Sequence, residues 1–351
     1  MTPTDWTALH GEVFDGARVL VTGGAGFIGL HLVGALLELG AVVTVIDDLS
    51  GSDGRSVTQL AAAAGDRLRF VEASVLNIDA LAEAMGGAEG DAQAGAELVF
   101  HQAAMGSVPR SVKEPRAYHE ANVMGTLNVL EAARLAGAKR VMFAASSSAY
   151  GESEVLPKVE TMPVLPLSPY AATKVAGEAM MRAYANSYAN EGDEGGPDTV
   201  CLRYFNIFGS RQNANSAYAA VIAAFAKALL AGERPVIYGD GEQSRDFTHV
   251  DNAVHANLLA ARAAGRMGGE VFNVACGKRV SVNMLATQMA AALGRPELMP
   301  LHRPERAGDV KHSLADLARI RKTLGYEPIV DFEPGLAATV DWYATVDPAA
   351  G

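Results

Sequence analysis

Residues 18–29 read RVLVTGGAGFIG, and this stretch decides the fold. Residues 18–22 form an apolar run typical of a buried strand, and three glycines follow at a spacing of three: Gly23, Gly26 and Gly29. The next residues are apolar at helical spacing. A glycine turn between a strand and a helix lets the backbone approach a pyrophosphate and directs the helix's first N–H groups at it. The stretch therefore predicts a dinucleotide site.

An acidic pair, Asp47 and Asp48, ends the second predicted strand (42–46), 18 residues after Gly29. A carboxylate here can accept hydrogen bonds from the adenosine ribose and would repel a 2′-phosphate. The pair predicts NAD as the cofactor in preference to NADP.

Apolar strand-like runs alternate with amphipathic helical stretches over the first two thirds of the chain. This alternation predicts an α/β fold, a Rossmann-like doubly wound parallel sheet with helices on both faces. Four further strands are expected at 67–72, 98–101, 141–145 and 199–204. We expect residues 1–205 to form the NAD-binding domain. Residues 206–351, here called the C-terminal part, are expected to form a smaller substrate-binding α/β region with some chain crossing back to the sheet.

The composition and net charge of the chain argue against several classes of function. The 351 residues are 49% hydrophobic with a formal net charge of −11, which argues against binding to nucleic acid or to an anionic membrane. Cys201 and Cys276 are the only cysteines and form no Cys-x-x-Cys pair, so we expect neither a disulfide framework nor a metal site. No signal peptide or membrane span is recognisable, and a cytoplasmic location is expected.

A second motif predicts proton-transfer chemistry. Tyr170 and Lys174 are four residues apart, so on a helix they share one face. A phenol has a pKa of about 10 and serves as a base near neutral pH only where positive charge favours the phenolate. Lys174 and a bound nicotinamide cation can supply that charge. A hydroxyl from the serine run that begins at Ser146 can bind the same substrate oxygen.

No Gly-x-Ser-x-Gly elbow surrounds the serines, which argues against a serine hydrolase. His101 ends a predicted strand and is interpreted as a packing or cofactor-adjacent residue.

These motifs resemble the extended short-chain dehydrogenase/reductase superfamily, and within it the nucleotide-sugar 4-epimerases. The similar stretches are VTGGAGFIG (21–29), HQAAMGSVPRSV (101–112), AASSSAYG (144–151), PLSPYAATK (166–174), LRYFNIFG (202–209), AYAAVI (217–222), GDGEQSRDF (239–247) and GDVKHSLAD (308–316). The sequence is most similar to epimerases of UDP-N-acetylglucosamine and UDP-N-acetylgalactosamine, and to relatives that act on the corresponding uronic acids.

The resemblance implies a reaction without net oxidation, in which C4 of a UDP-sugar is oxidised by tightly held NAD and then reduced from the opposite face. Tyr170, Lys174 and Ser146 are the implied catalytic residues. The implied cofactor-binding residues are Gly23, Gly26, Phe27, Ile28, Gly29, Asp47, Asp48, Ser74, Gln102, Ala103, Ala104, Asn122, Tyr170 and Lys174. The implied substrate-binding residues are Gly106, Ser107, Val108, Ser147, Ser148, Asn206, Gln212, Val221, Tyr238, Arg245, Arg306, Asp309 and Ser313. Ser74 departs from the family pattern, because an aspartate commonly contacts the adenine there.

The resemblance also bears on the sugar and on the assembly. Ser313 stands where members restricted to glucose and galactose carry a bulky tyrosine, so an N-acetylated hexose should fit. UDP-glucuronate and UDP-glucose remain alternative substrates. A 4,6-dehydratase or decarboxylase would carry acidic residues directly after Ser146, where this chain has Ser147, Ser148 and Ala149. A non-catalytic NAD-sensing protein would have lost the Tyr170–Lys174 pair. Family members usually form homodimers through the helix that bears the tyrosine.

Overall fold

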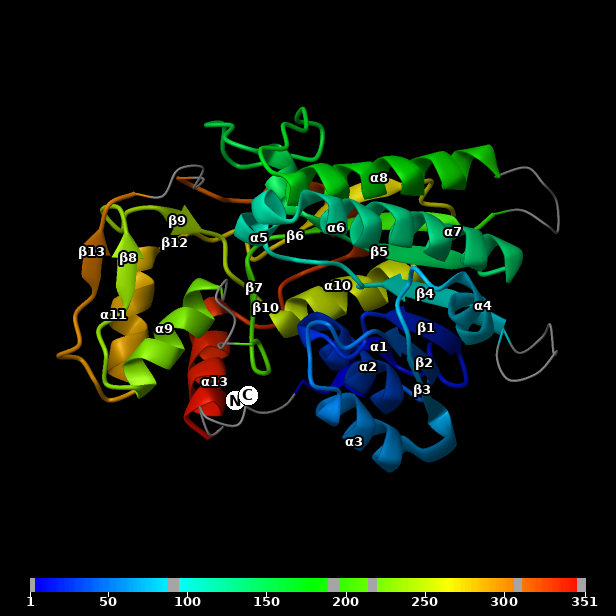
Figure 1. Cartoon of the computed structure of the whole chain (residues 1–351), viewed down its shortest axis with the longest axis horizontal. Helices are drawn as coiled ribbons and strands as arrows, with labels where there is room; N and C mark the ends of the chain where they lie inside the picture. The colour runs from blue at the N-terminus through cyan, green and yellow to red at the C-terminus, as the bar shows by residue number, and fades with distance from the viewer. Residues whose placement is uncertain (1–3, 87–94, 189–195, 214–219, 306–310, 346–351) are drawn as a thin grey trace.

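The computed structural model describes residues 4–86, 95–188, 196–213, 220–305 and 311–345 (Figure 1). Arg306 and Asp309, both predicted to bind substrate, lie outside the described residues.

A seven-stranded sheet forms the centre of the molecule, and every pair of neighbouring strands in it is parallel. Its strands are β1 (Arg18–Thr22), β2 (Val42–Asp47), β3 (Leu68–Glu72), β4 (Leu98–His101), β5 (Arg140–Ser146), β6 (Asp198–Tyr204) and β11 (Glu270–Val274). The predicted doubly wound α/β fold is confirmed, and the six expected strands lie within one or two residues of their predicted bounds.

The strand order is β11-β6-β5-β4-β1-β2-β3. The chain runs outward from β1 to β3 and then returns to place β4 on the other side of β1. In open parallel sheets a ligand binds outside the carboxyl ends of the strands at such a reversal. The end of β1, where Thr22 pairs with Ile46 and His101, is therefore the expected place for a dinucleotide.

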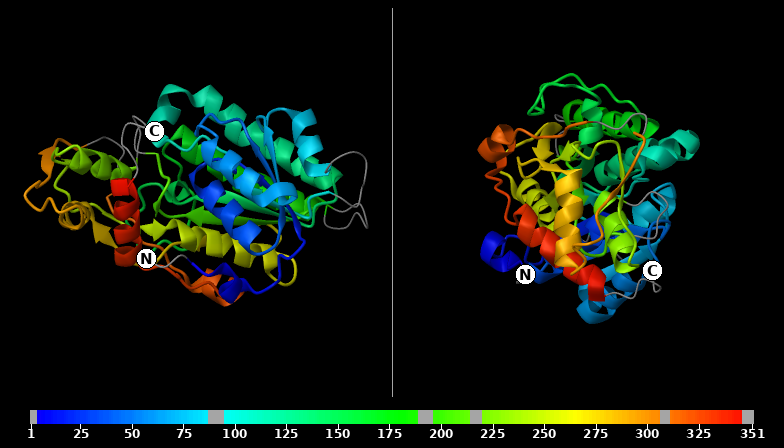
Figure 2. Two further views of the ribbon diagram at one scale, coloured as in Figure 1. Left: turned by 90° about the horizontal axis from the view of Figure 1, so that it is seen from below. Right: turned by 90° about the vertical axis from the view of Figure 1, so that its left-hand side faces the viewer.

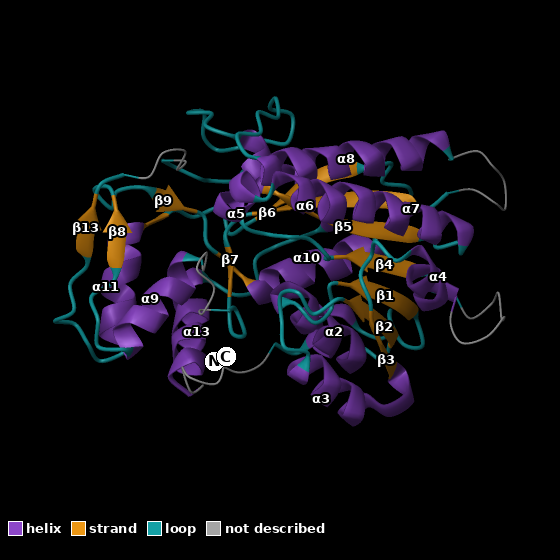
Figure 3. Cartoon of the chain, in the orientation of Figure 1, coloured by secondary structure: helices purple, strands orange, loops and turns teal. Residues whose placement is uncertain are grey.

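Helices cover both faces of the sheet, as Figure 1 and Figure 3 show. One layer contains α4 (Ile78–Gly86), α7 (Gly125–Leu135) and α8 (Pro169–Ser187). The opposite layer contains α1 (Trp6–His10), α2 (Phe27–Glu38), α10 (Val250–Arg262) and α12 (Ala318–Leu324). Helix α3 (Arg55–Ala64) packs on the edge strand β3, and η1 (Gly65–Arg67) links the two. Because β1, β5 and β6 contact a helix layer on each side, their residues are buried almost without interruption, as in Val19, Leu20 and Val21.

The C-terminal part builds a separate hydrophobic core beyond the carboxyl ends of the strands (Figure 2). Its elements are α9 (Val221–Leu230), β8 (Val236–Tyr238), β9 (Ser244–Arg245), β12 (Val280–Ser281), α11 (Val282–Ala292), β13 (Leu301–Arg303) and α13 (Phe332–Thr345). A short parallel pair, β7 (Ile207–Phe208) with β10 (Thr248–His249), joins this part to the sheet.

The chain crosses back from the C-terminal part, because β11 completes the sheet and α10 packs on α2, β5 and β6. A division at residue 205 therefore separates two substructures that share one sheet. A search of the described residues finds no helix that combines the length and apolar character needed to cross a bilayer.

Candidate active site

The glycine turn fits tightly against the end of β4. Gly23 has φ +68°, and a Cβ at this position would lie 2.6 Å from the backbone nitrogen of Ala103. A Cβ at Gly29 would lie 2.1 Å from the carbonyl oxygen of Gly23. Only glycine fits at both positions, and the backbone of the turn stays open to a ligand.

The first turn of α2 is suited to an anion. Gly26 is its N-cap, and no side chain there accepts a hydrogen bond from the first-turn N–H groups. These groups have no partner within a helix, so a pyrophosphate can accept from them at the residues predicted for it, Phe27, Ile28 and Gly29.

The two aspartates at the end of β2 have different surroundings. The carboxylate of Asp47 accepts hydrogen bonds from the backbone N–H groups of Ala25 (3.0 Å) and Leu49 (2.8 Å), so it braces the glycine turn. Burial raises the pKa of Asp47, and these backbone hydrogen bonds oppose the rise. Asp48 is exposed and accepts from the N–H of Ser50 at 3.0 Å.

Ser52 lies in the loop between β2 and α3 and was missed by the sequence interpretation. Its Oγ is buried and has no hydrogen-bond partner among the described residues. An unpaired buried hydroxyl needs a partner, and a ribose or phosphate oxygen of the cofactor would supply one. The open helix terminus, the closely approached glycines and this hydroxyl all fit NAD. Ser74, in the turn after β3, accepts from the N–H of Leu76 at 3.2 Å.

A buried relay of hydrogen bonds connects the end of β1 with the helix layer above it. Thr22 Oγ1 lies 2.7 Å from His101 Nδ1, and His101 Nε2 lies 2.9 Å from Thr126 Oγ1, which donates to the Asn122 carbonyl at 2.6 Å. This pattern places the single imidazole proton on Nε2 and leaves Nδ1 to accept from Thr22. Burial lowers the pKa of His101 to about 3. His101 is thus a neutral packing residue.

The side chains of Gln102 and Asn122, both predicted to bind the cofactor, are engaged by the protein. Gln102 forms a closed ring of amide and phenol hydrogen bonds with Tyr204 and Asn257. Asn122 lies in a single π-helical turn, η2 (Glu120–Met124), and binds both backbone polar groups of Met105 at 2.8 and 3.1 Å. These contacts fix the loop at the carboxyl end of β4, which contains Ala103 and the exposed Ala104.

Helix α8 presents the catalytic candidates. Ser168 caps it by accepting from the N–H of Ala171 at 3.1 Å, and Pro169 takes the first position, where a missing N–H does no harm. Asn122 Nδ2 donates to Thr173 Oγ1 at 3.0 Å, and Thr173 donates to the carbonyl of Tyr170 at 2.7 Å. The relay that starts at Thr22 therefore ends at the backbone of Tyr170.

The structure brings Ser146 and Tyr170 together. Ser146 is the last residue of β5, and its hydrogen bond lowers the pKa of Tyr170 while the stronger effect of burial raises it above 10. Ser148 donates to Ser146 Oγ at 2.9 Å through its hydroxyl and at 3.2 Å through its N–H. Ser146 thus accepts from Ser148 and keeps its own proton for Tyr170 or for a substrate oxygen. Ser147 follows Ser146 in the one-turn helix η3 (Ser147–Tyr150).

Lys174 is buried one turn further along α8. Its Nζ donates to the carbonyl oxygen of Ala144 at 2.8 Å and lies 5.0 Å from the centre of the Phe143 ring. Burial lowers the pKa of Lys174 to about 8, and Glu178 opposes the shift. The sequence interpretation expected this ammonium to hold the phenol ionised. The chain's own residues instead leave Tyr170 protonated at neutral pH, because burial dominates.

Tyr118 connects Tyr170, the predicted catalytic tyrosine, with the predicted sugar loop. Its ring meets that of Tyr170 edge to face, with centroids 6.4 Å apart and planes at 89°. Its hydroxyl accepts the N–H of Ser107 at 3.0 Å. Ser107 caps α5 (Val108–Lys113), and α6 (Pro115–His119) carries Tyr118. Gly106 and Val108, both exposed, flank Ser107. Sequence reasoning missed Tyr118 because no motif marks a contact made across two helices.

Three predicted substrate residues of the C-terminal part meet around Asp246. Asn206, at φ +39°, donates to the carbonyl of Asp246 at 3.2 Å. Arg245 donates to the carbonyl of Ser244 at 3.1 Å, and the N–H of Ser313 donates to the same carbonyl at 3.0 Å. The carboxylate of Asp246 is fully buried and accepts backbone N–H groups of Cys276, Gly277 and Ala315, which fixes the loops on both sides.

The remaining predicted substrate residues lie on neighbouring elements of the C-terminal part. Gln212 donates from Nε2 to the Ile207 carbonyl at 3.2 Å, while its Oε1 is buried and unpaired within the part of the chain that the structure describes. Tyr238 ends β8 and Val221 begins α9.

Comparison with known proteins agrees with this geometry. Residues 19–275 match the NAD dependent epimerase/dehydratase family. A UDP-glucose 4-epimerase of Mycolicibacterium smegmatis is 40% identical over 329 residues, which cover 93% of this chain and 98% of that protein. A dTDP-glucose 4,6-dehydratase of Streptomyces niveus is 33% identical over 334 residues, covering 93% of this chain and 92% of that protein.

A solved structure is similar over almost the whole chain. It is UDP-N-acetylglucosamine 4-epimerase from Methanobrevibacter ruminantium M1 in complex with UDP-N-acetylmuramic acid, with a TM-score of 0.84 and 38% identity. The match covers 94% of this chain and 99% of that one. The glycine turn, the Tyr170–Lys174 helix and these matches lead to one conclusion: the chain belongs to the NAD-dependent epimerase/dehydratase family.

Proposed function

We infer that this chain is an isomerase that interconverts the C4 epimers of a UDP-sugar. We further propose that its sugars are N-acetylglucosamine and N-acetylgalactosamine, or their uronic acids. The epimerase activity is supported by the relatives above and by the constellation of Ser146, Tyr170 and Lys174. The choice of sugar is supported by one observation, the small side chain of Ser313.

Bound NAD would supply the reversible hydride acceptor that oxidation and re-reduction at C4 require. The task of Tyr170 is to move one proton at the 4-oxygen, taking it during oxidation and giving it back during reduction. Burial keeps the phenol neutral in the protein alone, which suits the giving step. The taking step needs positive charge nearby, and Lys174, with a pKa of about 8, stays mostly charged at neutral pH. Ser146 donates a second hydrogen bond at the same site.

Ser313 is a small residue at a predicted substrate position. It is half-buried, and its backbone is fixed to the Ser244 carbonyl that also accepts from Arg245. A tyrosine here would project a ring into the volume that an acetamido group would occupy. Excluding a bulky substituent by a steric clash discriminates strongly, whereas a roomy pocket also admits the smaller sugar.

The test is a substrate panel run on the wild-type protein and on Ser313→Tyr. UDP-glucose, UDP-N-acetylglucosamine and their 6-carboxylates are incubated with each protein, and the configuration at C4 is read by NMR. We expect wild type to epimerise the N-acetylated sugar. Ser313→Tyr should lose at least about tenfold in kcat/KM for that sugar and keep its rate with UDP-glucose. Unchanged selectivity would show that position 313 does not border the 2-substituent.

A UDP-glucose or UDP-glucuronate 4-epimerase is the second candidate, and the 40% identical relative favours UDP-glucose. The same panel separates these substrates. A 4,6-dehydratase is less favoured despite the 33% identical relative, because elimination at C5 and C6 needs a further acid and base. The residues directly after Ser146 are Ser147, Ser148 and Ala149, which supply no carboxylate.

The proposal includes a homodimer in the cytoplasm that supplies sugars for polysaccharide assembly. Support for a dimer comes from two exposed apolar side chains, Met124 and Leu135, beside α8 on η2 and α7. Light scattering should give twice the 36.7 kDa mass of the chain. A monomer at micromolar concentration would contradict this part of the proposal.

A further inference from the structure

Residues 209–212, here called the clasp, cross from the C-terminal part to the glycine helix. They follow β7 directly. Gly209 lies between Val250 and Phe27, which leave no room for a side chain at this position. A Cβ at Gly209 would lie 2.6 Å from Val250 Cγ1 at the start of α10 and 3.5 Å from Phe27 Cε2 at the start of α2. The clasp therefore touches the residue that follows the N-cap of the pyrophosphate helix.

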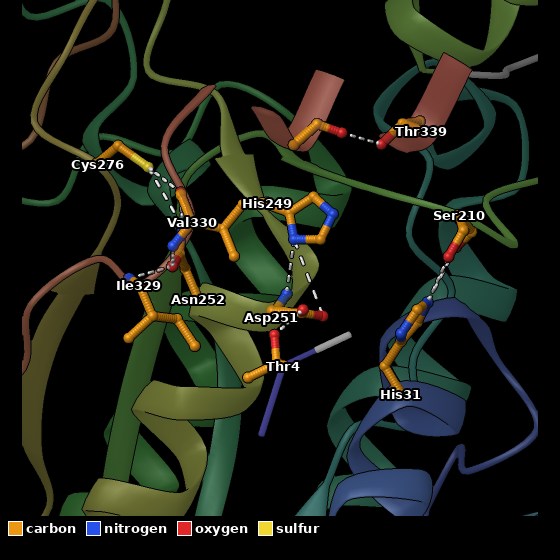
Figure 4. Close-up of polar contacts among 11 residues, drawn as sticks. Thr4, His31, Ser210, His249, Asp251, Asn252, Cys276, Ile329, Val330 and Thr339 are labelled. Atoms are coloured by element: carbon orange, nitrogen blue, oxygen red, sulfur yellow. Dashed lines mark hydrogen bonds and ion pairs between the residues drawn. The ribbon is translucent and has the colours of Figure 1, made fainter. Parts of the chain in front are cut away.

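Two side chains of the cofactor-binding half, His31 and Ser56, form hydrogen bonds with the clasp. His31 Nε2 lies 3.0 Å from the carbonyl oxygen of Ser210, which can only accept, so the imidazole donates. Figure 4 shows the His31 ring pointing at Ser210. The same ring packs edge to face on Phe27, with centroids 5.9 Å apart. Arg211, at φ +67°, donates to Ser56 Oγ in the first turn of α3 at 3.1 Å.

The far end of the clasp is tied to the C-terminal helix. The hydroxyl of Tyr343 on α13 donates to the carbonyl of Gln212 at 2.6 Å, and Gln212 Nε2 donates back to Ile207. The clasp is therefore anchored at both ends, by α2 and α3 on one side and by α13 on the other.

The anchoring points border the expected position of the cofactor. The first turn of α2 would hold the pyrophosphate, and the loop between β2 and α3, with Asp48 and Ser52, would lie near the adenosine ribose. We propose that the clasp retains NAD between turnovers, and that His31 and Arg211 are the positioning residues that set the rate at which NAD leaves. A 4-epimerase returns the hydride in every cycle, so its chemistry never requires NAD to be exchanged. The proposal rests on the family's use of NAD and is independent of which sugar is the substrate.

The experiment measures NAD release from the holoenzyme, not turnover. NAD-loaded protein is passed into cofactor-free buffer, and the NAD remaining on the protein is quantified by chromatography at timed intervals. Arg211→Ala and Ser56→Ala should each speed release roughly tenfold, which corresponds to about 1.4 kcal/mol. The double variant should release NAD no faster than either single variant, because both remove the same hydrogen bond.

Substitutions of His31 provide a second, independent test of the proposal. His31→Ala should speed release by a similar factor. His31→Gln should restore slow release, because an amide N–H can also donate to the Ser210 carbonyl. A loss of packing on Phe27 alone would not be rescued by a specific donor.

The matched control is Arg55→Ala. Arg55 is the exposed neighbour of Ser56 on α3 and pairs with Asp53 at 2.9 Å, and it takes part in none of the clasp hydrogen bonds described above. The Arg55→Ala substitution should leave the rate of NAD release unchanged.

The proposal is overturned if Arg211→Ala, Ser56→Ala and His31→Ala all release NAD at the wild-type rate, or if Arg55→Ala speeds NAD release equally. Ser56→Ala is a mild surface change, so the test stands even if a larger substitution impairs folding. Because no sugar is present in the assay, failure of the substrate panel does not affect this result.

Discussion

Tyr170 sits in surroundings that orient it from several directions. Its backbone carbonyl accepts from Thr173, its ring meets Tyr118 edge to face, and its hydroxyl receives a hydrogen bond from Ser146. Such positioning would place the phenol for the proposed proton transfer before any substrate binds. Burial raises the pKa of Tyr170, so the site also depends on the charge of Lys174 and of the cofactor.

The variant Tyr170→Phe isolates this proton transfer, since it keeps the ring and removes only the hydroxyl. We expect kcat to fall by about 10²- to 10⁴-fold, the usual contribution of a positioned acid or base. The dissociation constant of the UDP-sugar, measured by calorimetry, should change little. Tyr184→Phe is the matched control, because Tyr184 lies further along α8 and bonds to Glu131. Appreciable epimerisation by Tyr170→Phe would exclude Tyr170 as the proton carrier.

At the residue scale, local motifs could be predicted from the sequence and long-range partners could not. The glycine turn and the Tyr170–Lys174 spacing follow from local geometry. The partners of Arg211 and Tyr118 lie on other elements, Ser56 on α3 and Ser107 before α5, and no periodicity records such pairs. The same holds for Ser52, whose role depends on its unpaired hydroxyl in the folded loop.

At the element scale, Arg140 fastens the C-terminal end of α10 to the sheet. Its guanidinium binds the carboxylate of Asp198 at 3.0 Å and the carbonyls of Ala260, Ala261 and Ala263. Asp198 in turn accepts the N–H groups of Met267 and Gly268 just before β11. One buried ion pair thus connects β5, β6, α10 and the approach to β11.

We expect Arg140→Met to lower the free energy of unfolding by about 3–5 kcal/mol, because it leaves the buried Asp198 carboxylate without its cation. Urea unfolding followed by circular dichroism measures this loss. Arg18→Met is the control, since Arg18 pairs with Glu97 at a partly exposed position and should change stability by less than about 1 kcal/mol. Equal losses in the two variants would contradict the importance assigned to burial.

Strands β1 to β6 could be predicted because apolar runs bounded by turns are local signals. Helix α10 and strand β11 could not be assigned to the sheet from the sequence. Every residue of α10 from Asn252 to Ala261 is buried, so the helix has no polar face to reveal its period. Asn252 donates to the Val330 carbonyl and Asn257 to the Tyr204 hydroxyl, and both partners lie far away in the sequence.

At the scale of the whole molecule, buried ionisable groups predict how stability depends on pH. Burial lowers the pKa of His101 to about 3 and those of His10 and His255 to about 4. In the unfolded chain a histidine takes its proton near pH 6.5, so acid favours unfolding below that pH. Burial raises the pKa of Asp246 to about 6, from 3.8 when unfolded, and also raises the pKa values of Asp47 and Glu160, so these carboxyls oppose the trend.

Burial also lowers the pKa values of His31 and His249, so five histidines gain protons on unfolding and three carboxyls lose them. Each net proton changes stability by about 1.4 kcal/mol per pH unit. We therefore expect the free energy of unfolding to fall by roughly 2–3 kcal/mol per unit between pH 6 and 4. Urea titrations at several pH values measure the slope. His10 and His255 contact each other directly, with His10 Nε2 3.0 Å from His255 Nδ1, where α1 docks on α10. Replacing both by apolar residues, in His10→Phe with His255→Leu, removes two of the protons gained on unfolding and should flatten the slope. A double variant as acid-sensitive as wild type would mean that this histidine pair is already exposed to protons in the folded protein.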